Sequence, residues 1–84
     1  MPFTMRAPLS TGPGRGDLIE DSSTLDISEL GVRLRLRGHV VPGQIVNLFF
    51  NSHPEQCRVV WTSPVGNGEI LNAGLEFTCP LSDR

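Results

Sequence analysis

The sequence predicts an all-β protein, a small antiparallel β-barrel of about five to six strands with a flexible N-terminal arm. In several segments apolar residues alternate with polar ones at a period of two, and turns rich in Gly, Pro, Asn and Ser separate these segments. Nowhere do apolar residues recur at spacings of three and four over a helical length. A two-sheet sandwich would show the same pattern, so that alternative stays open.

The length of 84 residues is expected to give one small domain, and a chain of this length buries only about 60–65% of the surface that its unfolded form exposes. Residues 1–17 are rich in Pro and Gly, a composition that resists helix and strand alike, and we expect a flexible or extended arm there. The predicted barrel domain covers residues 18–80, and residues 81–84 form a short tail.

Five segments have strand patterns. Residues 18–27 are compatible with a strand, although their centre is polar, and residues 32–37 alternate Val or Leu with Arg. Residues 45–50 are an apolar run of strand length, and residues 57–62 alternate again. Residues 70–77 form the last predicted strand. The expected core is the following set: Leu25, Val32, Leu34, Leu36, Val46, Leu48, Phe50, Val59, Trp61, Leu75 and Phe77.

The charge pattern argues against general binding of DNA or RNA, which requires a strongly basic face. The formal net charge is −2, and all positive side chains are arginines, with no lysine. Guanidinium groups can hold phosphate or guanine in a two-pronged manner, but a GC-rich genome also favours arginine. No apolar run reaches the ~20 residues of a membrane span, and the N-terminus lacks the order of a signal peptide. We therefore expect a cytoplasmic protein without membrane insertion.

The residues with catalytic or metal-binding chemistry are scattered. Cys57 and Cys79 lack metal-ligand spacing and are expected to be thiols, and His39 and His53 stand alone near turns. No nucleophile–histidine–acid grouping and no carboxylate pair for acid–base work occur. We expect neither an enzyme, nor a metal site, nor a cofactor.

The hexapeptide Asp26-Ile-Ser28-Glu-Leu-Gly31 is the stretch that best suits a ligand site. Short Asp and Ser side chains bond nearby backbone, and Gly permits positive φ, so a shaped turn between strands is expected. The stretch also combines a carboxylate, a hydroxyl and approachable backbone. Holding the turn is the first interpretation of Asp26 and Ser28, and ligand contact is compatible with it.

Asp26, Ser28 and Gly31 resemble, at this spacing, the D/N-x-S-x-x-G signature of PilZ domains, bacterial modules that bind cyclic di-GMP. The similarity continues through the alternating segment 32–37, a G-x-x-V-x-L type segment at 43–48, V-x-W at 59–61 and G-x-x-F at 74–77. The resemblance implies a cyclic di-GMP sensor or adaptor with the ligand against the outside of the barrel. The ligand-contact residues that it implies are Arg6, Asp26, Ser28, Gly31 and Arg33.

The sequence departs from the family at the R-x-x-x-R motif that precedes the signature in ligand-binding members. Pro2 lies four residues before Arg6, and Thr11 lies four residues before Arg15. Arg6 is thus the remaining candidate clamp, unless the natural chain begins upstream of Met1. Ordering of the arm on binding would then signal to an unidentified protein partner. The alternative is a binding-inactive barrel that acts as a protein–protein interaction module.

The stripe Arg33, Arg35 and Arg37 has two interpretations. It is first the solvated face of a sheet, balanced by Glu20, Glu55, Glu69 or Glu76 on other strands, and secondly a phosphate- or partner-binding surface. The aromatic residues are expected in the core rather than as base-stacking platforms, with Phe49 as the outward exception.

Overall fold

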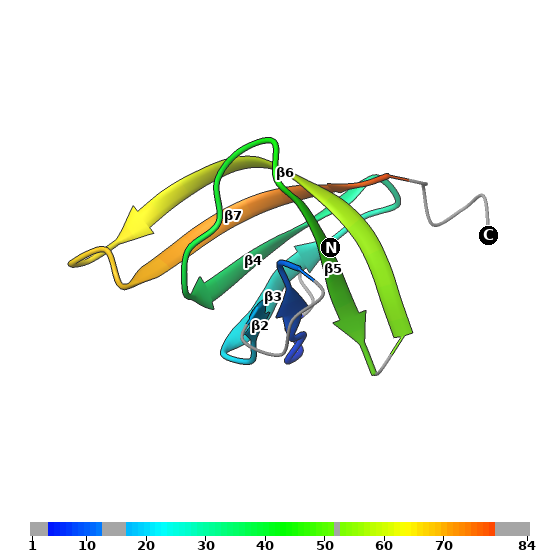
Figure 1. Ribbon diagram of the computed structural model, residues 1–84, viewed down its shortest axis with the longest axis horizontal. Coiled ribbons are helices and arrows are strands. Elements are labelled where there is room, and N and C mark those ends of the chain that lie inside the picture. The colour runs from blue at the N-terminus through cyan, green and yellow to red at the C-terminus, as the bar shows by residue number, and fades with distance from the viewer. Residues whose placement is uncertain (1–3, 13–16, 52, 79–84) are drawn as a thin grey trace.

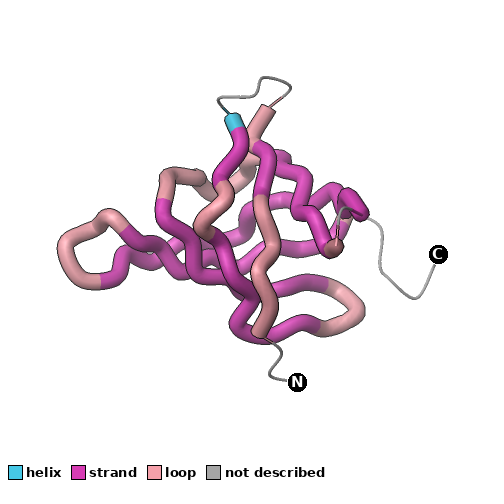
Figure 2. The backbone as a smooth tube through the Cα atoms, turned by 90° about the horizontal axis from the view of Figure 1, so that it is seen from below, coloured by secondary structure: helices cyan, strands magenta, loops and turns pink. Residues whose placement is uncertain are grey.

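A computed structural model describes residues 4–12, 17–51 and 53–78, and within them all regular structure is strand, apart from a single turn of 3₁₀ type at Asp17. The strands form one antiparallel sheet (Figures 1 and 2). Their bounds are β1 Leu9–Ser10, β2 Leu18–Ile19, β3 Ser22–Ile27, β4 Gly31–Arg37, β5 Ile45–Phe50, β6 His53–Val65 and β7 Ile70–Phe77.

The all-β prediction is confirmed, whereas the strand count is seven rather than five to six in the described part of the chain. The order across the sheet is β2-β1-β5-β6-β7-β4-β3, which is an open ladder with β2 and β3 at its ends. Closure of the barrel therefore stays a prediction. The tail at residues 81–84, Cys79 and parts of the expected arm lie outside the described residues.

Strands β4, β5 and β7 match the predicted segments because their apolar alternation places one face on the core. The predicted strand 18–27 is divided at Glu20 and Asp21 into β2 and β3, as its polar centre suggested. Strand β6 is longer than predicted and curves over the top of the molecule in Figure 1. Its far end forms with β7 the hairpin that projects at the left of that view.

Two prolines explain why β6 was predicted too short. Pro54 and Pro64 both lie inside β6, although proline cannot donate a backbone hydrogen bond to a neighbouring strand. Strand β5 pairs with β6 only as far as Arg58, and β7 pairs with β6 only from Cys57 onwards. Each proline therefore lies where β6 has a single neighbouring strand, and a missing donor is tolerated there.

Residues 5–10, the N-terminal segment, are paired and packed, which agrees with the extended alternative for the arm and not with the flexible one. Leu9 and Ala7 are fully buried, and β1 pairs with both β2 and β5. The preceding residues bond β3 instead: the backbone N–H of Ala7 donates to Ser22 O and that of Thr24 to Met5 O, each at 2.9 Å. One short segment thus joins the β5 side of the sheet to its β3 end. Pairing with residues distant in sequence decides its structure, and local composition could not show this.

Most of the predicted core is confirmed. Three expected members differ: Phe50 is half-buried and packs against the core, Leu25 is half-buried at an irregularity of β3, and Trp61 is exposed. The buried apolar residues are Ala7, Leu9, Val32, Leu34, Leu36, Val40, Val46, Leu48, Cys57, Val59, Leu71, Ala73, Leu75 and Phe77. This cluster includes two residues of the N-terminal segment, so that segment is part of the domain's packing.

The burial of Leu9 predicts that the N-terminal segment stabilises the whole domain. Leu9→Ala should lower the free energy of unfolding by about 2–5 kcal/mol, because it leaves a cavity in the core. Leu18→Ala, on the exposed side of the paired strand β2, should cost no more than about 1 kcal/mol. Urea unfolding followed by circular dichroism measures both, and equal effects of the two substitutions would contradict the packing described.

Candidate functional site

The turn between β3 and β4 is held by Ser28 and Gly31. The backbone N–H of Ser28 donates to Gly31 O at 2.8 Å, and the N–H of Gly31 donates to the Ser28 hydroxyl oxygen at 3.3 Å. Gly31 has no positive φ, contrary to the reason expected for it. A side-chain carbon at Gly31 would instead collide with the carbonyl oxygen of Leu75 on β7. The turn is therefore fixed at its base against a neighbouring strand.

Asp26 bonds a side chain rather than the backbone of the turn. Its Oδ2 accepts a hydrogen bond from Arg33 Nε at 2.7 Å and a second from Arg33 Nη2. A register shift between Thr24 and Asp26 adds a residue to β3. Because side chains alternate between the faces of a strand, this bulge turns Asp26 outward to face Arg33. The side chains of Asp26 and Arg33 remain 29% and 56% exposed, so a ligand can reach both.

The Arg33 guanidinium lowers the pKa of the Asp26 carboxyl from its ordinary value, chiefly through the hydrogen bond and also through its charge. In return Asp26 raises the pKa of Arg33. The carboxylate is therefore ionised throughout the neutral range. The turn offers a hydrogen-bond acceptor and a set of guanidinium donors side by side.

Trp61 lies on the same outer face, which sequence alternation failed to predict. A second register shift, between Val59 and Trp61, makes Val60 the extra residue and turns Trp61 out of the core. The indole covers Gly74 so closely that any side chain at Gly74 would collide with it. Gly74 faces Arg33 on β4, and Arg33 faces Asp26 on β3. Asp26, Arg33, Gly74 and Trp61 thus form one row across four strands, which we call the outer row.

Gly74 is the residue through which the sequence pointed to close packing at the outer row. A glycine within a predicted strand indicates close approach of another group. Here that group is the indole of Trp61, rather than backbone or a ligand. No local pattern indicates that a bulge in the neighbouring strand β6 supplies the approaching side chain.

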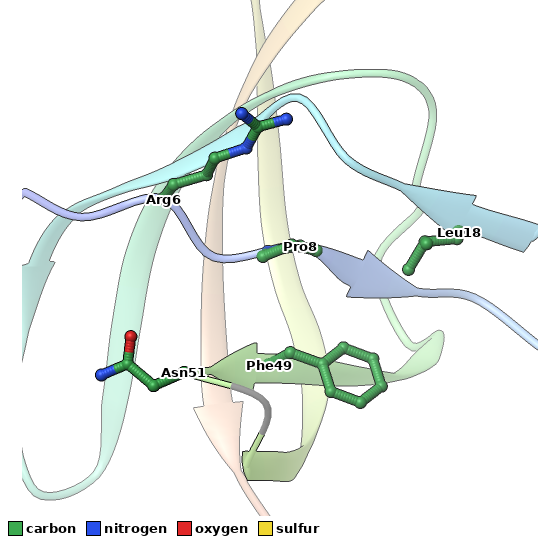
Figure 3. A pocket seen from close by; sticks show the side chains of 5 residues that line it. All are labelled: Arg6, Pro8, Leu18, Phe49 and Asn51. Carbon is green, nitrogen blue, oxygen red and sulfur yellow. The ribbon is translucent and has the colours of Figure 1, made fainter.

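Arg6, the expected clamp, lines a hollow that contains no residue of the Asp26–Gly31 turn. Its Nε donates to Glu20 O at 3.3 Å, and Arg6 lines an open hollow of about 490 Å³ with Pro8, Leu18, Phe49 and Asn51. Figure 3 shows its guanidinium on one side of Pro8 and the Phe49 ring on the other. Phe49 is half-buried beside this hollow. Within the described residues no hydrogen bond joins Arg6 to the Asp26–Gly31 turn.

The arginine stripe is largely balanced by acidic residues. Arg37 pairs with Asp21 at 3.1 Å and with Glu69 at 3.3 Å, and Arg58 on β6 pairs with Glu76. Two acids depart from the expectation. Glu20 offers its backbone oxygen to Arg6, whereas Glu55 is buried and its carboxylate lies 3.2 Å from His53.

The described residues lack two further features. They contain no group of three or more His, Cys, Asp or Glu placed to hold a metal ion. They also contain no helix long and apolar enough to cross a membrane.

The Asp26–Arg33 pair predicts a defined pH response. The Asp26 carboxyl should titrate below 3.8, its ordinary pKa, and Arg33→Gln should raise that pKa because the donor and the charge are lost. A carboxyl whose pKa is lowered by folding adds stability above its unfolded pKa, and that stability is lost as the pH falls through the folded pKa. A carbon-detected NMR titration of the Asp side chains measures the shift. An Asp26 pKa unchanged by Arg33→Gln would refute the pairing.

The comparisons with known proteins assign a family. A family model described as PilZ domain matches residues 1–84, which is the whole chain. Neither the curated proteins nor the solved structures searched contain a match.

Proposed function

Because the chain belongs to the PilZ domain family, we propose that it is a cyclic di-GMP-binding module of bacterial second-messenger signalling that acts in the cytoplasm. PilZ domains are binding domains rather than catalytic ones, so the chain is not proposed as an enzyme. The observation that carries the proposal is the outer row, in which an exposed carboxylate, a guanidinium and an indole lie side by side next to a fixed turn.

The chemistry of the outer row suits a guanine base. Arginine donates in a two-pronged manner to guanine O6 and N7, and a carboxylate accepts from the N–H groups on the base's Watson–Crick edge. An exposed indole offers a surface on which a base stacks, worth about 1–3 kcal/mol per base. Asp26, Arg33 and Trp61 are the residues to which we assign these contacts. Ser28 and Gly31 hold the turn in place and offer a hydroxyl and backbone to the same ligand.

Arg6 is proposed to contribute after a change of side-chain position. It is exposed, and its described hydrogen bond is a long one to a neutral backbone oxygen. Exchanging that bond for one to a phosphate replaces a neutral acceptor by a charged one, which roughly doubles the strength of a hydrogen bond. Because Ala7 and Leu9 are buried, the proposed signal is a movement of side chains on a fixed segment.

The second candidate is a module that binds a protein partner without the nucleotide. Val60 and Trp61 are consecutive exposed residues of β6, and Ile45, about half exposed, lies on β5 opposite Arg58, two residues before Val60. Exposed apolar side chains that lie together are typical of docking surfaces. The engagement of Asp26 by Arg33 also favours this candidate, since a ligand must compete with an existing pair.

Calorimetric titration with cyclic di-GMP tests the first candidate. We expect saturable binding, and Asp26→Ala or Ser28→Ala should weaken it by roughly ten- to a hundredfold, since a hydrogen bond to a charged group contributes about 1.5–3 kcal/mol. Glu29→Ala, an exposed change in the same turn, is the matched control and should leave affinity unchanged. Absence of heat at high micromolar ligand would favour the protein-binding alternative.

Trp61 supplies an independent test because it is the chain's only tryptophan. Stacking of a base on the indole should quench its fluorescence in proportion to occupancy. Trp61→Ala should weaken binding by about tenfold or more, as expected for a lost stacking contact. Val60→Ala, at the neighbouring exposed position, should bind as the wild type does. An unchanged emission at saturating ligand would remove Trp61 from the proposed site.

A further inference from the structure

The described arginines divide into two groups by their partners. Arg33, Arg37 and Arg58 each face a carboxylate. Arg35 bonds only the side-chain oxygen of Asn72, at 3.1 Å, and Arg6 bonds only a backbone oxygen. Across residues 4–12, 17–51 and 53–78, Arg6 and Arg35 are thus the cations whose charge no ion pair balances.

The register places these two arginines on either side of one small residue. Ser23 on β3 pairs with Arg35 on β4, and on its other side it forms an isolated bridge with Arg6. Adjacent strands lie about 4.8 Å apart, so the two Cα atoms are roughly 10 Å apart. Paired residues share a face, and both arginines are exposed. Their side chains can therefore reach a common point above Ser23.

The surface is hollowed on the Arg35 side of Ser23, whereas Arg6 lines the hollow that also contains Phe49. A cavity of about 300 Å³ is lined by Thr4, Ser23, Leu25 and Arg35, together with the ion pair of Asp21 and Arg37. Arg37 is shared between Asp21 and Glu69, so it offsets the charge of Asp21 only in part, and Asp21 is a weaker obstacle to an anion than an unpaired carboxylate would be. The hollow also lies next to Asp26, which follows Leu25 on β3.

We propose that Arg6 and Arg35 together form a phosphate site over Ser23. Two guanidinium groups that converge on one anion bind it by charge-assisted hydrogen bonds, and the serine hydroxyl adds a donor between them. The assignment to a phosphodiester of cyclic di-GMP rests on the proposed function, whereas the anion site itself rests on the register and the charges.

Arg6 and Arg35 can exchange their present hydrogen-bond partners for a phosphate, because both partners are neutral oxygens. Leaving an amide oxygen or a backbone oxygen costs little at an exposed position, and the gain is a contact with a full negative charge. Arg33 and Arg37 would instead have to give up a carboxylate. Arg35 is therefore the residue of the stripe that can bind a phosphate without giving up an ion pair.

Calorimetry with cyclic di-GMP tests the role of Arg35. Arg35→Gln and Arg6→Gln should each weaken binding by tenfold or more, and both should reduce its dependence on salt. Arg58→Gln removes a similarly exposed guanidinium from the same face of the sheet but one paired with Glu76, and it should change affinity by less than twofold. Binding that is unaffected by Arg35→Gln would overturn the site and leave the proposed function standing.

Titration with inorganic pyrophosphate tests the anion site independently of the proposed function. In NMR spectra of the arginine Nε–H groups, pyrophosphate should shift the signals of Arg6 and Arg35 together, and Arg35→Gln should abolish the shift at Arg6. If this result is obtained but cyclic di-GMP does not bind, the anion site stands and the proposed function fails. If pyrophosphate moves neither signal, or moves all arginine signals equally, the two-arginine site is wrong.

Discussion

The surface chemistry of this domain depends on two extra residues in its strands. Leu25 in β3 and Val60 in β6 interrupt the regular alternation of side chains, and each interruption turns the next residue to the outer face. Without them, a strict period of two would direct Asp26 and Trp61 toward the core. With them, both residues lie at the ends of a row that also contains Arg33. The bulges thus convert two buried positions into the ends of a polar and aromatic surface.

Close packing of the backbone keeps that surface in place. Gly31 admits the carbonyl oxygen of Leu75, and Gly74 admits the indole of Trp61, so the turn and the indole both rest on β7. Strand β7 pairs with β4 on one side and β6 on the other and is the scaffold of the site. Residues held by such packing lose little freedom when a ligand binds, which is the benefit of preorganisation.

The sequence predicted what alternation and turn chemistry determine. Strands β4, β5 and β7 and the turn at Asp26–Gly31 follow from local patterns. Local alternation predicts Trp61 in the core, because a bulge arises from pairing with a neighbouring strand and has no local signal. Leu9 falls in the expected flexible or extended arm for the same reason, since β5 and β2 together give it a structure. Register also decides that Arg33 faces Asp26 and that Arg35 faces Asn72 instead of a carboxylate. One sequence does not specify register.

Binding of a guanine nucleotide by the outer row and its turn can be mapped through the backbone amide NMR shifts of the ¹⁵N-labelled protein during titration with cyclic di-GMP. We expect the largest shifts at residues 26–33 and at Trp61 and Gly74, with saturation at a common affinity. Shifts confined to the hollow beside Phe49, or no shifts at saturating concentrations of the nucleotide, would contradict binding at the outer row.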